Sequence, residues 1–328
     1  MGTFFQKKID NETRLIFMES NSIPMNIPIE TNVDKAPWAL FPIEIFQLIL
    51  FKSDFLTQIR LRCVNELFCS KLEIHDFWGD DFWSTYSGCS KYIDNDILRS
   101  YPFIRSLDID SNPNVTNINF LTRLEKLDIC ATCSIGDAGI ANLNLKYLRC
   151  RGNKRVTNIN HMTKLEYLQA ANDKTGISDS SIVNLANLTT LIVWDNTKIR
   201  NVGHLTNLTS LNASEMCGIG STGISNLNLR KLIASNNLKI TNVNHMTRLE
   251  VLDAGFDCGI GDAGITKLNL RKLYAQNNSR ITDVNHMSRL KILHADGQYC
   301  GIDDAGISNL KLITLGSYEN LKITKRSS

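Results

Sequence analysis

Leucines recur at nearly constant intervals along the chain from about residue 104 onward. Eleven of them hold the same place in an LxxL-type pattern, at intervals of 20 to 23 residues, and the residue two positions later is always small or apolar. Because side chains of a strand alternate between its two faces, each unit is predicted to contain a short strand with both residues pointing inward. This interval predicts stacked coils with one continuous core. The leucines are Leu107, Leu127, Leu148, Leu168, Leu191, Leu211, Leu232, Leu252, Leu273, Leu293 and Leu315.

Asparagines form a second regular column, five residues after the leucine in every other unit. At the turn that leaves the strand, an inward amide group can bond backbone groups that would otherwise be buried without a partner. We therefore predict a structural role for this column. Its members are Asn112, Asn153, Asn196, Asn237, Asn278 and Asn320.

The units alternate between two sequence types. One type reads LIASNNLKITNVNHM, as in 232–246, and the other contains CGIGDAGI, as in 258–265. The first resembles the short leucine-rich repeat NxITDIxxLxxL, and the second resembles the cysteine-containing type with CxxITDxGI. The resemblance implies an α/β leucine-rich-repeat solenoid over residues 104–328, with a parallel concave sheet of about eleven strands.

The predicted outward positions, one and three residues after each leucine, vary from unit to unit. Large apolar groups near the middle suit an interface anchor, and charged groups beside them can set the orientation of a partner. Eleven strands would span roughly 50 Å, which suits a protein or an extended peptide better than a small substrate. The predicted target-binding residues are Arg149, Arg151, Ile192, Trp194, Ile233, Asp253, Phe256, Tyr274, Gln276, His294 and Asp296.

The segment before the repeats divides into three parts. Residues 1–36 are polar and are predicted to be a flexible tail. Residues 37–77 are predicted to be helical, because Pro42 suits a first helical turn and Ile45 and Ile49 share one helical face. Residues 78–103 are rich in aromatic side chains and are predicted to be a linker and an N-terminal cap, since a solenoid needs its first coil covered.

The order of residues in the helical segment resembles an F-box, LPxEIxxxIL followed by a leucine and RxVC. Phe41 separates the expected Leu-Pro pair, Cys63 and Val64 stand in reversed order, and Leu67-Phe68 replaces the usual tryptophan. The resemblance implies docking on a Skp-family adaptor of a cullin ubiquitin ligase, while the repeats hold a target protein. The implied adaptor-binding residues are Leu40, Pro42, Ile45, Ile49, Leu50, Leu56, Ile59 and Val64. The alternative is a stand-alone leucine-rich-repeat interaction scaffold, in which these helices only cap the solenoid.

Composition adds few constraints. The 328 residues are 43% hydrophobic and carry a formal charge of +3. No basic run with interleaved aromatic residues predicts nucleic-acid binding. The longest apolar stretch, residues 38–51, is too short and too interrupted for a membrane span, and no signal peptide is evident. We expect a cytoplasmic protein, with the nucleus as an alternative compartment.

The cysteines and histidines offer no predicted metal or catalytic site. Nine cysteines without a secretory signal indicate free thiols. Equivalent cysteines lie at least two strands, or about 10 Å, apart, too far for a disulfide or a shared metal. The histidines at 161, 204, 245 and 286 form a similar column, and only His294 is predicted to be exposed. No phosphate loop, HExxH or GxSxG motif is present, so we expect neither enzyme activity nor a cofactor.

Overall fold

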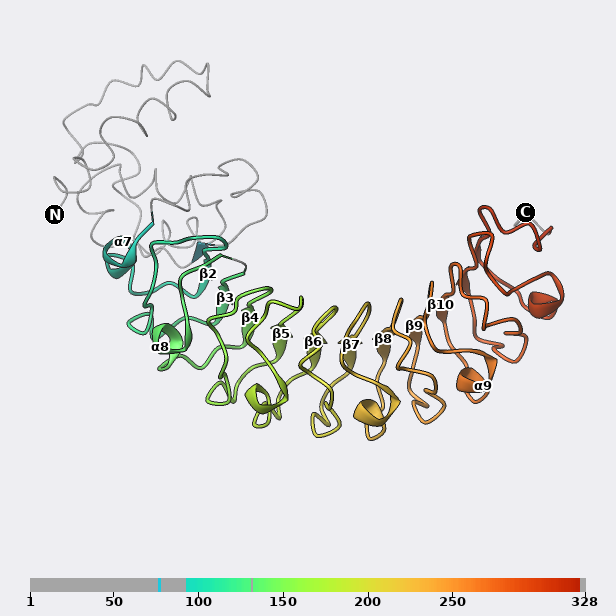
Figure 1. Cartoon of the computed structure of the whole chain (residues 1–328), viewed down its shortest axis with the longest axis horizontal. Helices are drawn as coiled ribbons and strands as arrows, with labels where there is room; N and C mark the ends of the chain where they lie inside the picture. Colours follow the sequence, from blue (N-terminus) through green and yellow to red (C-terminus); the bar gives the residue numbers. More distant parts are fainter. Residues whose placement is uncertain (1–75, 78–92, 131, 325–328) are drawn as a thin grey trace, which may run out of the picture.

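The computed structural model describes residues 76–77, 93–130 and 132–324. They form a single curved solenoid, in which the strands line the concave side and the helices α8 (Asp137–Ile140) and α9 (Asp262–Ile265) lie on the outer side (Figure 1). The tail and the predicted adaptor-binding residues fall outside the described part of the chain.

The strands form one parallel sheet in chain order, without an interruption at the 23-residue interval. Each leucine of the repeat pairs in register with the leucine of the next unit, which confirms the predicted parallel concave sheet. The eleven repeat strands are β2 (Ser106–Asp108), β3 (Lys126–Asp128), β4 (Tyr147–Arg149), β5 (Tyr167–Gln169), β6 (Thr190–Ile192), β7 (Ser210–Asn212), β8 (Lys231–Ile233), β9 (Val251–Asp253), β10 (Lys272–Tyr274), β11 (Ile292–His294) and β12 (Thr314–Gly316).

A twelfth strand, β1 (Asp76–Phe77), precedes the repeats and pairs with β2. These two residues belong to the segment that was predicted to be helical, so the helical prediction is wrong for them. The physical reason is the open edge of β2, whose free backbone groups are satisfied by an extended neighbour.

The core follows the predicted columns. From β2 to β11, the leucine of each strand and the residue two positions later are fully buried. In the last strand, Leu315 and Ser317 are only half-buried. No described strand pairs with the far edge of β12, which explains this difference.

The buried asparagines bond as predicted. The Asn153 side-chain Nδ2 donates to the carbonyl oxygens of Ile129 at 3.0 Å and Ile135 at 3.2 Å. Its Oδ1 accepts the backbone N–H groups of Arg155 at 2.8 Å and Val156 at 3.3 Å. Each such amide therefore joins its own turn to the preceding coil. The same donation to two carbonyls recurs at Asn196, Asn237, Asn278 and Asn320.

Short helical turns cross the outer side between the coils. Besides α8 and α9, they are the 3₁₀ turns η4 (Asp179–Ser181), η5 (Ser221–Ile224) and η6 (Ala305–Ile307). Glycine allows these turns to approach the next coil, since a Cβ at Gly264 would lie 2.2 Å from the Thr241 carbonyl oxygen. In the 23-residue unit Ser181 holds this place, and its hydroxyl donates to the Thr157 carbonyl oxygen at 2.5 Å.

The helix α7 (Asn95–Arg99) lies at the N-terminal end of the repeats, within the predicted cap. The Asp94 carboxylate caps it by accepting the Ile97 N–H at 2.9 Å. Leu98 is fully buried, and the Arg99 guanidinium lies 4.5 Å from the centre of the Phe120 ring. This helix thus covers apolar side chains of the first coil.

The cysteines of the second repeat type are buried free thiols, as predicted. Burial raises the pKa of Cys217 and of Cys258 to about 11, so both stay protonated at neutral pH. Among the described residues, no group of three or more His, Cys, Asp or Glu side chains could hold a metal ion. Within the same ranges, no helix combines the length and the apolar character needed to cross a bilayer.

Candidate functional site

The concave sheet presents two parallel rows of outward side chains, set by the register of the strands. We call the residue after each repeat leucine the central row, and the residue before it the first row. In the central row, Arg149, Gln169 and Ile192 lie side by side on β4, β5 and β6. Further along, Ile233, Asp253, Tyr274 and His294 continue the row on β8 to β11.

The two predicted arginines have different surroundings. The Arg149 guanidinium pairs with the Asp128 carboxylate at 3.1 Å, and its Nε donates to Gln169 Oε1 at 2.9 Å. Arg151 is exposed, and its guanidinium lies 5.9 Å from the centre of the Trp194 ring. Arg149 is therefore part of the sheet's own network, whereas Arg151 faces solvent.

The predicted apolar anchors lie in the middle of the sheet. Ile192, Trp194 and Ile233 are all half-buried, so each shows part of its apolar surface to solvent. Asn212 lies between the two isoleucines in the central row, and its Oδ1 accepts the Ser214 N–H at 3.1 Å. The apolar surface is thus two separate contact points around a polar side chain.

A second group of predicted residues lies near the C-terminal end of the sheet. The Tyr274 and His294 rings stack with centroids 5.0 Å apart, and His294 Nδ1 lies 3.4 Å from Asp296 Oδ2. Gln276 is half-buried in the same region. Because β6 and β10 are four strands, or roughly 19 Å, apart, this group and the Arg151–Trp194 group are two separate clusters of side chains.

Phe256 has an unusual backbone. It is 49% exposed and lies at a left-handed φ of 56°, which is costly for a bulky side chain. The same position in other coils holds residues such as Gly152, Asn172 and Asn236, all with positive φ. The left-handed turn after the strand is thus a property of the repeat, and Phe256 occupies it despite its side chain.

The prediction that residues three positions after the leucine face outward is only partly correct. Arg151 is exposed and Trp194 is half-buried, but Ala171, Ser214 and Gly255 are buried. Each repeat strand ends one residue after its leucine, so the alternation no longer applies at these positions. Asp253 has a structural role here, since its carboxylate accepts the Gly255 N–H at 3.1 Å. Burial raises the pKa of Asp253.

The first row contains residues that the sequence prediction missed. Tyr147 and Tyr167 stack with their ring centroids 4.0 Å apart and their planes 6° apart. The alternation of a strand places the residue before the leucine on the same face as the residue after it. That rule alone identifies both tyrosines as concave-face residues next to Arg149.

The N-terminal end of the central row is acidic and largely buried. Asp108 and Asp128 are paired in register on β2 and β3. Burial raises the pKa of Asp108 to about 7 and also raises the pKa of Asp128. Arg149 forms its ion pair with the carboxylate of Asp128 and not with that of Asp108.

The expectation that only His294 is exposed is wrong. His294 is half-buried, whereas His161, His204, His245 and His286 are exposed on the turns beyond the strands. Each of these four rings places Nε2 3.1 to 3.2 Å from the carbonyl oxygen of an isoleucine in the preceding unit. This contact holds the ring against the coil surface while leaving one side in water.

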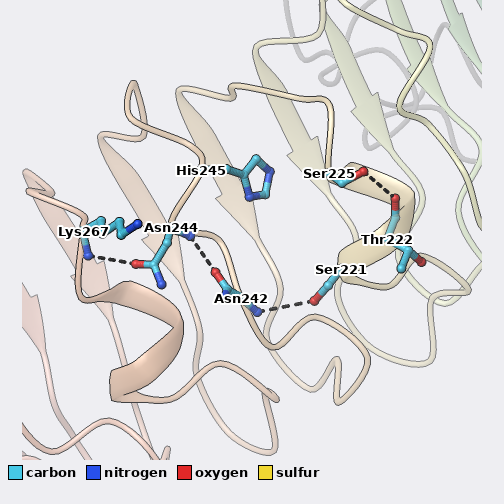
Figure 2. A pocket seen from close by; sticks show the side chains of 7 residues that line it. All are labelled: Ser221, Thr222, Ser225, Asn242, Asn244, His245 and Lys267. Carbon is cyan, nitrogen blue, oxygen red and sulfur yellow. Dashed lines mark hydrogen bonds between the residues drawn. The ribbon is translucent and has the colours of Figure 1, made fainter.

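The outer side contains an open hollow of about 450 Å³ (Figure 2). Much of its polar lining serves the turns themselves, since Asn244 Oδ1 accepts the Lys267 N–H at 2.8 Å and Asn242 Oδ1 accepts the Asn244 N–H at 2.9 Å. None of the predicted target-binding residues lies in it. The lining residues are Ser221, Thr222, Ser225, Asn242, Asn244, His245 and Lys267.

No protein-family model and no curated protein matches the sequence. The functional domain of InlJ from Listeria monocytogenes superposes with a TM-score of 0.42 at 18% identity, covering 68% of this chain and 60% of that chain. The mouse RP105/MD-1 complex superposes with a TM-score of 0.44 at 14% identity, and the match covers 69% of this chain and 44% of that chain. Internalin C2 from Listeria monocytogenes superposes with a TM-score of 0.35 at 18% identity, and the match covers 64% of this chain and 90% of that chain. The chain thus spans less than two thirds of the first two proteins.

Proposed function

We propose that this leucine-rich-repeat protein is a binding scaffold whose concave sheet holds a partner protein. The observation that carries the proposal is the set of large, half-buried side chains at Ile192, Trp194 and Ile233 in the middle of that sheet. Large apolar and aromatic groups in a central position are typical anchors of protein interfaces. The neighbouring inward positions are filled by small or aliphatic groups and are fully buried, so the outward side chains are not needed to build the core.

The shape of the surface favours a protein partner over a small molecule. Ten inter-strand steps from β2 to β12 give a sheet roughly 48 Å long. Small-molecule sites are concave pockets that enclose most of the ligand. The hollow of about 450 Å³ lined by Ser221 and His245 lies on the outer side and is open to solvent.

The proposal can be tested by site-specific photocrosslinking in the cells that produce the protein. A photoreactive amino acid replaces Ser210, which lies in the first row between the two isoleucine-bearing strands. A matched control replaces Asn226, an exposed residue just after η5 on the outer side. We expect a discrete adduct from position 210 and none from position 226. Equal adducts from both positions, or none from 210, would contradict a concave binding surface.

A second candidate function is substrate recognition for a cullin-type ubiquitin ligase. It is supported by the F-box-like order of residues in the segment 37–77, which includes Pro42 and Ile45. On this proposal the segment binds a Skp-family adaptor, the concave sheet binds the target, and a separate enzyme transfers ubiquitin to it. The stand-alone scaffold remains the simpler alternative.

An adaptor pull-down separates these two candidates. The purified full chain is compared with a Pro42→Ala, Ile45→Asp double variant and with an Ile233→Asp variant on the concave face. The ligase proposal expects adaptor binding that only the double variant loses, with the thermal melt of the repeats unchanged. An intact chain that fails to bind the adaptor leaves the stand-alone scaffold.

A further inference from the structure

Arg151 is a charged residue of the concave face for which the described structure provides no ion-pair partner. Its side chain is exposed, and among the described residues no carboxylate lies within ion-pair distance of it. Arg149, two residues earlier, is matched by Asp128 at 3.1 Å and by Gln169 at 2.9 Å. One arginine is thus neutralised within the sheet, while the other keeps a free positive charge.

The free charge is held in place by its neighbours. Arg151 and Trp194 belong to the units of β4 and β6, about 10 Å apart along the sheet. Ala171 occupies the equivalent position between them and is fully buried, so no large side chain blocks the approach. The guanidinium reaches to 5.9 Å from the centre of the Trp194 ring, within cation–π range. An arginine restrained in this way loses less side-chain entropy when it binds a planar anion.

We propose that the partner presents a carboxylate side chain to Arg151, and an apolar side chain about three residues away to Ile233 on β8. The proposal rests on the concave binding function and specifies the chemistry of its partner. The Arg151 guanidinium lies beside Trp194 of the β6 unit, and Ile233 lies two strands further along the sheet, about 10 Å away. Because an extended chain advances about 3.3 Å per residue, the two side chains of the partner are about three residues apart. An aromatic side chain beside an arginine is typical of residues that dominate interface energies.

The surroundings favour an acidic protein segment over a nucleic acid. The acidic residues Asp108, Asp110 and Asp128 follow on the N-terminal side, with only Arg149 paired to them. A phosphate backbone needs several positive charges along its path, and the exposed Asp110 carboxylate would repel it. A single carboxylate on Arg151, with an apolar neighbour directed toward β8, avoids the acidic end.

The test uses a defined probe, a phage-displayed library of random twelve-residue peptides selected on the purified full chain. Selections are run in parallel on Arg151→Gln, on Arg151→Glu and on Lys272→Gln. Lys272→Gln is the matched control, because it removes one exposed positive charge from β10 on the same sheet. Bound peptides are sequenced, and their affinities for each protein are measured by fluorescence anisotropy.

We expect the intact chain to enrich peptides with Asp or Glu about three positions from an aliphatic or aromatic residue. Arg151→Gln should weaken their binding by about tenfold or more, and Lys272→Gln should not. Arg151→Glu should enrich Lys or Arg at the place of the acidic residue, an exchange that a purely structural role would not produce.

Two other results are informative in different ways. Enriched peptides that lack an acidic residue, or that bind Arg151→Gln equally well, would overturn this inference and leave the binding function intact. If the intact chain enriches no peptide over a Trp194→Ala, Ile233→Ala double variant, the concave binding function fails, and the inference fails with it.

Discussion

The asparagine column and the central row run through the same coils but follow opposite rules. Asn153, Asn196 and Asn237 make the same bonds in successive pairs of coils. In the central row, Arg149, Gln169 and Ile192 differ in charge, polarity and size on three neighbouring strands. A buried amide has one arrangement that satisfies its partners, whereas an outward side chain has none imposed on it by the coil. Repetition therefore marks the scaffold, whereas the varied outward row is the surface on which the proposed binding function rests.

The largest expected effect comes from removing one amide of the asparagine column, which tests its structural role. Asn237→Ala leaves the carbonyl oxygens of Ala213 and Ile219 and the Lys239 N–H without their buried partner. We expect a loss of about 3 to 5 kcal/mol in the free energy of unfolding, measured by urea denaturation. Asn226 is exposed, and the control Asn226→Ala should change the free energy of unfolding by less than about 0.5 kcal/mol. A loss for Asn237→Ala as small as the control's would contradict the structural role of the column.

A smaller effect is expected from the glycine of the outer turn. In Gly264→Ala the new methyl group would meet the Thr241 carbonyl oxygen, which lies 2.2 Å from an ideal Cβ. Backbone must shift to relieve this contact, at a cost of about 1 to 3 kcal/mol in the same assay. The neighbouring exposed residue offers the control Ala263→Ser, for which we expect no measurable change. Equal stability of the two variants would show that the outer turns are not closely packed.

Asp108 sharpens the comparison because it lies in the variable row and yet is buried. Its pKa is raised from the ordinary 3.8 to about 7, so the unfolded chain loses this proton first as the pH rises. The folded state is therefore disfavoured progressively between about pH 4 and pH 7. Asp108→Asn should remove this dependence, and Asn212 shows that an amide can accept the same N–H group in another coil.

The expected gain for Asp108→Asn at pH 8 is about 1 to 2 kcal/mol in the free energy of unfolding, part of the roughly 4 kcal/mol that the full shift would represent. At pH 3.5 the two proteins should be nearly equally stable. Urea denaturation across this range measures the difference, and Asp253→Asn provides a partly exposed comparison in the same row. A difference that is independent of pH would contradict the raised pKa.

The smallest expected effect comes from Phe256, a bulky residue at a left-handed backbone position that several other coils fill with glycine or asparagine. Phe256→Asn places at φ 56° a residue that the equivalent positions 172, 236 and 277 already hold at positive φ. Relief of this strain should raise stability by about 1 kcal/mol, or about 2 to 4 °C in Tm. Gln276→Asn, in the same region, should leave the Tm unchanged. A lower Tm for Phe256→Asn would mean that the ring contributes packing to the coil.

The strands and the buried columns of the solenoid could be predicted from the sequence, because the same residue types recur in every coil or in every other coil. The interval between leucines predicted all eleven repeat strands, and the recurring asparagines predicted the column of buried amide hydrogen bonds. What escaped prediction depends on contacts between different coils. The pairing of Arg149 with Asp128 and the approach of Arg151 to Trp194 join residues 21 and 43 positions apart that no repeat rule relates.

Two other misses had a physical cause of a different kind. The first-row tyrosines follow from alternation, which applies on both sides of the leucine. The left-handed turn could not be read from Glu215 or Phe256, since neither is a residue that favours positive φ. Only the backbone of the neighbouring coils, with glycine or asparagine at that position, reveals it.

The most direct test of the account is a Trp194→Ala, Ile233→Ala double variant that carries the photoreactive residue at position 210. If the scaffold and the binding surface are separable, the variant should lose less than half of the stability that Asn237→Ala loses, while the adduct disappears. An adduct of unchanged yield would contradict the central claim that the middle of the concave sheet holds the partner.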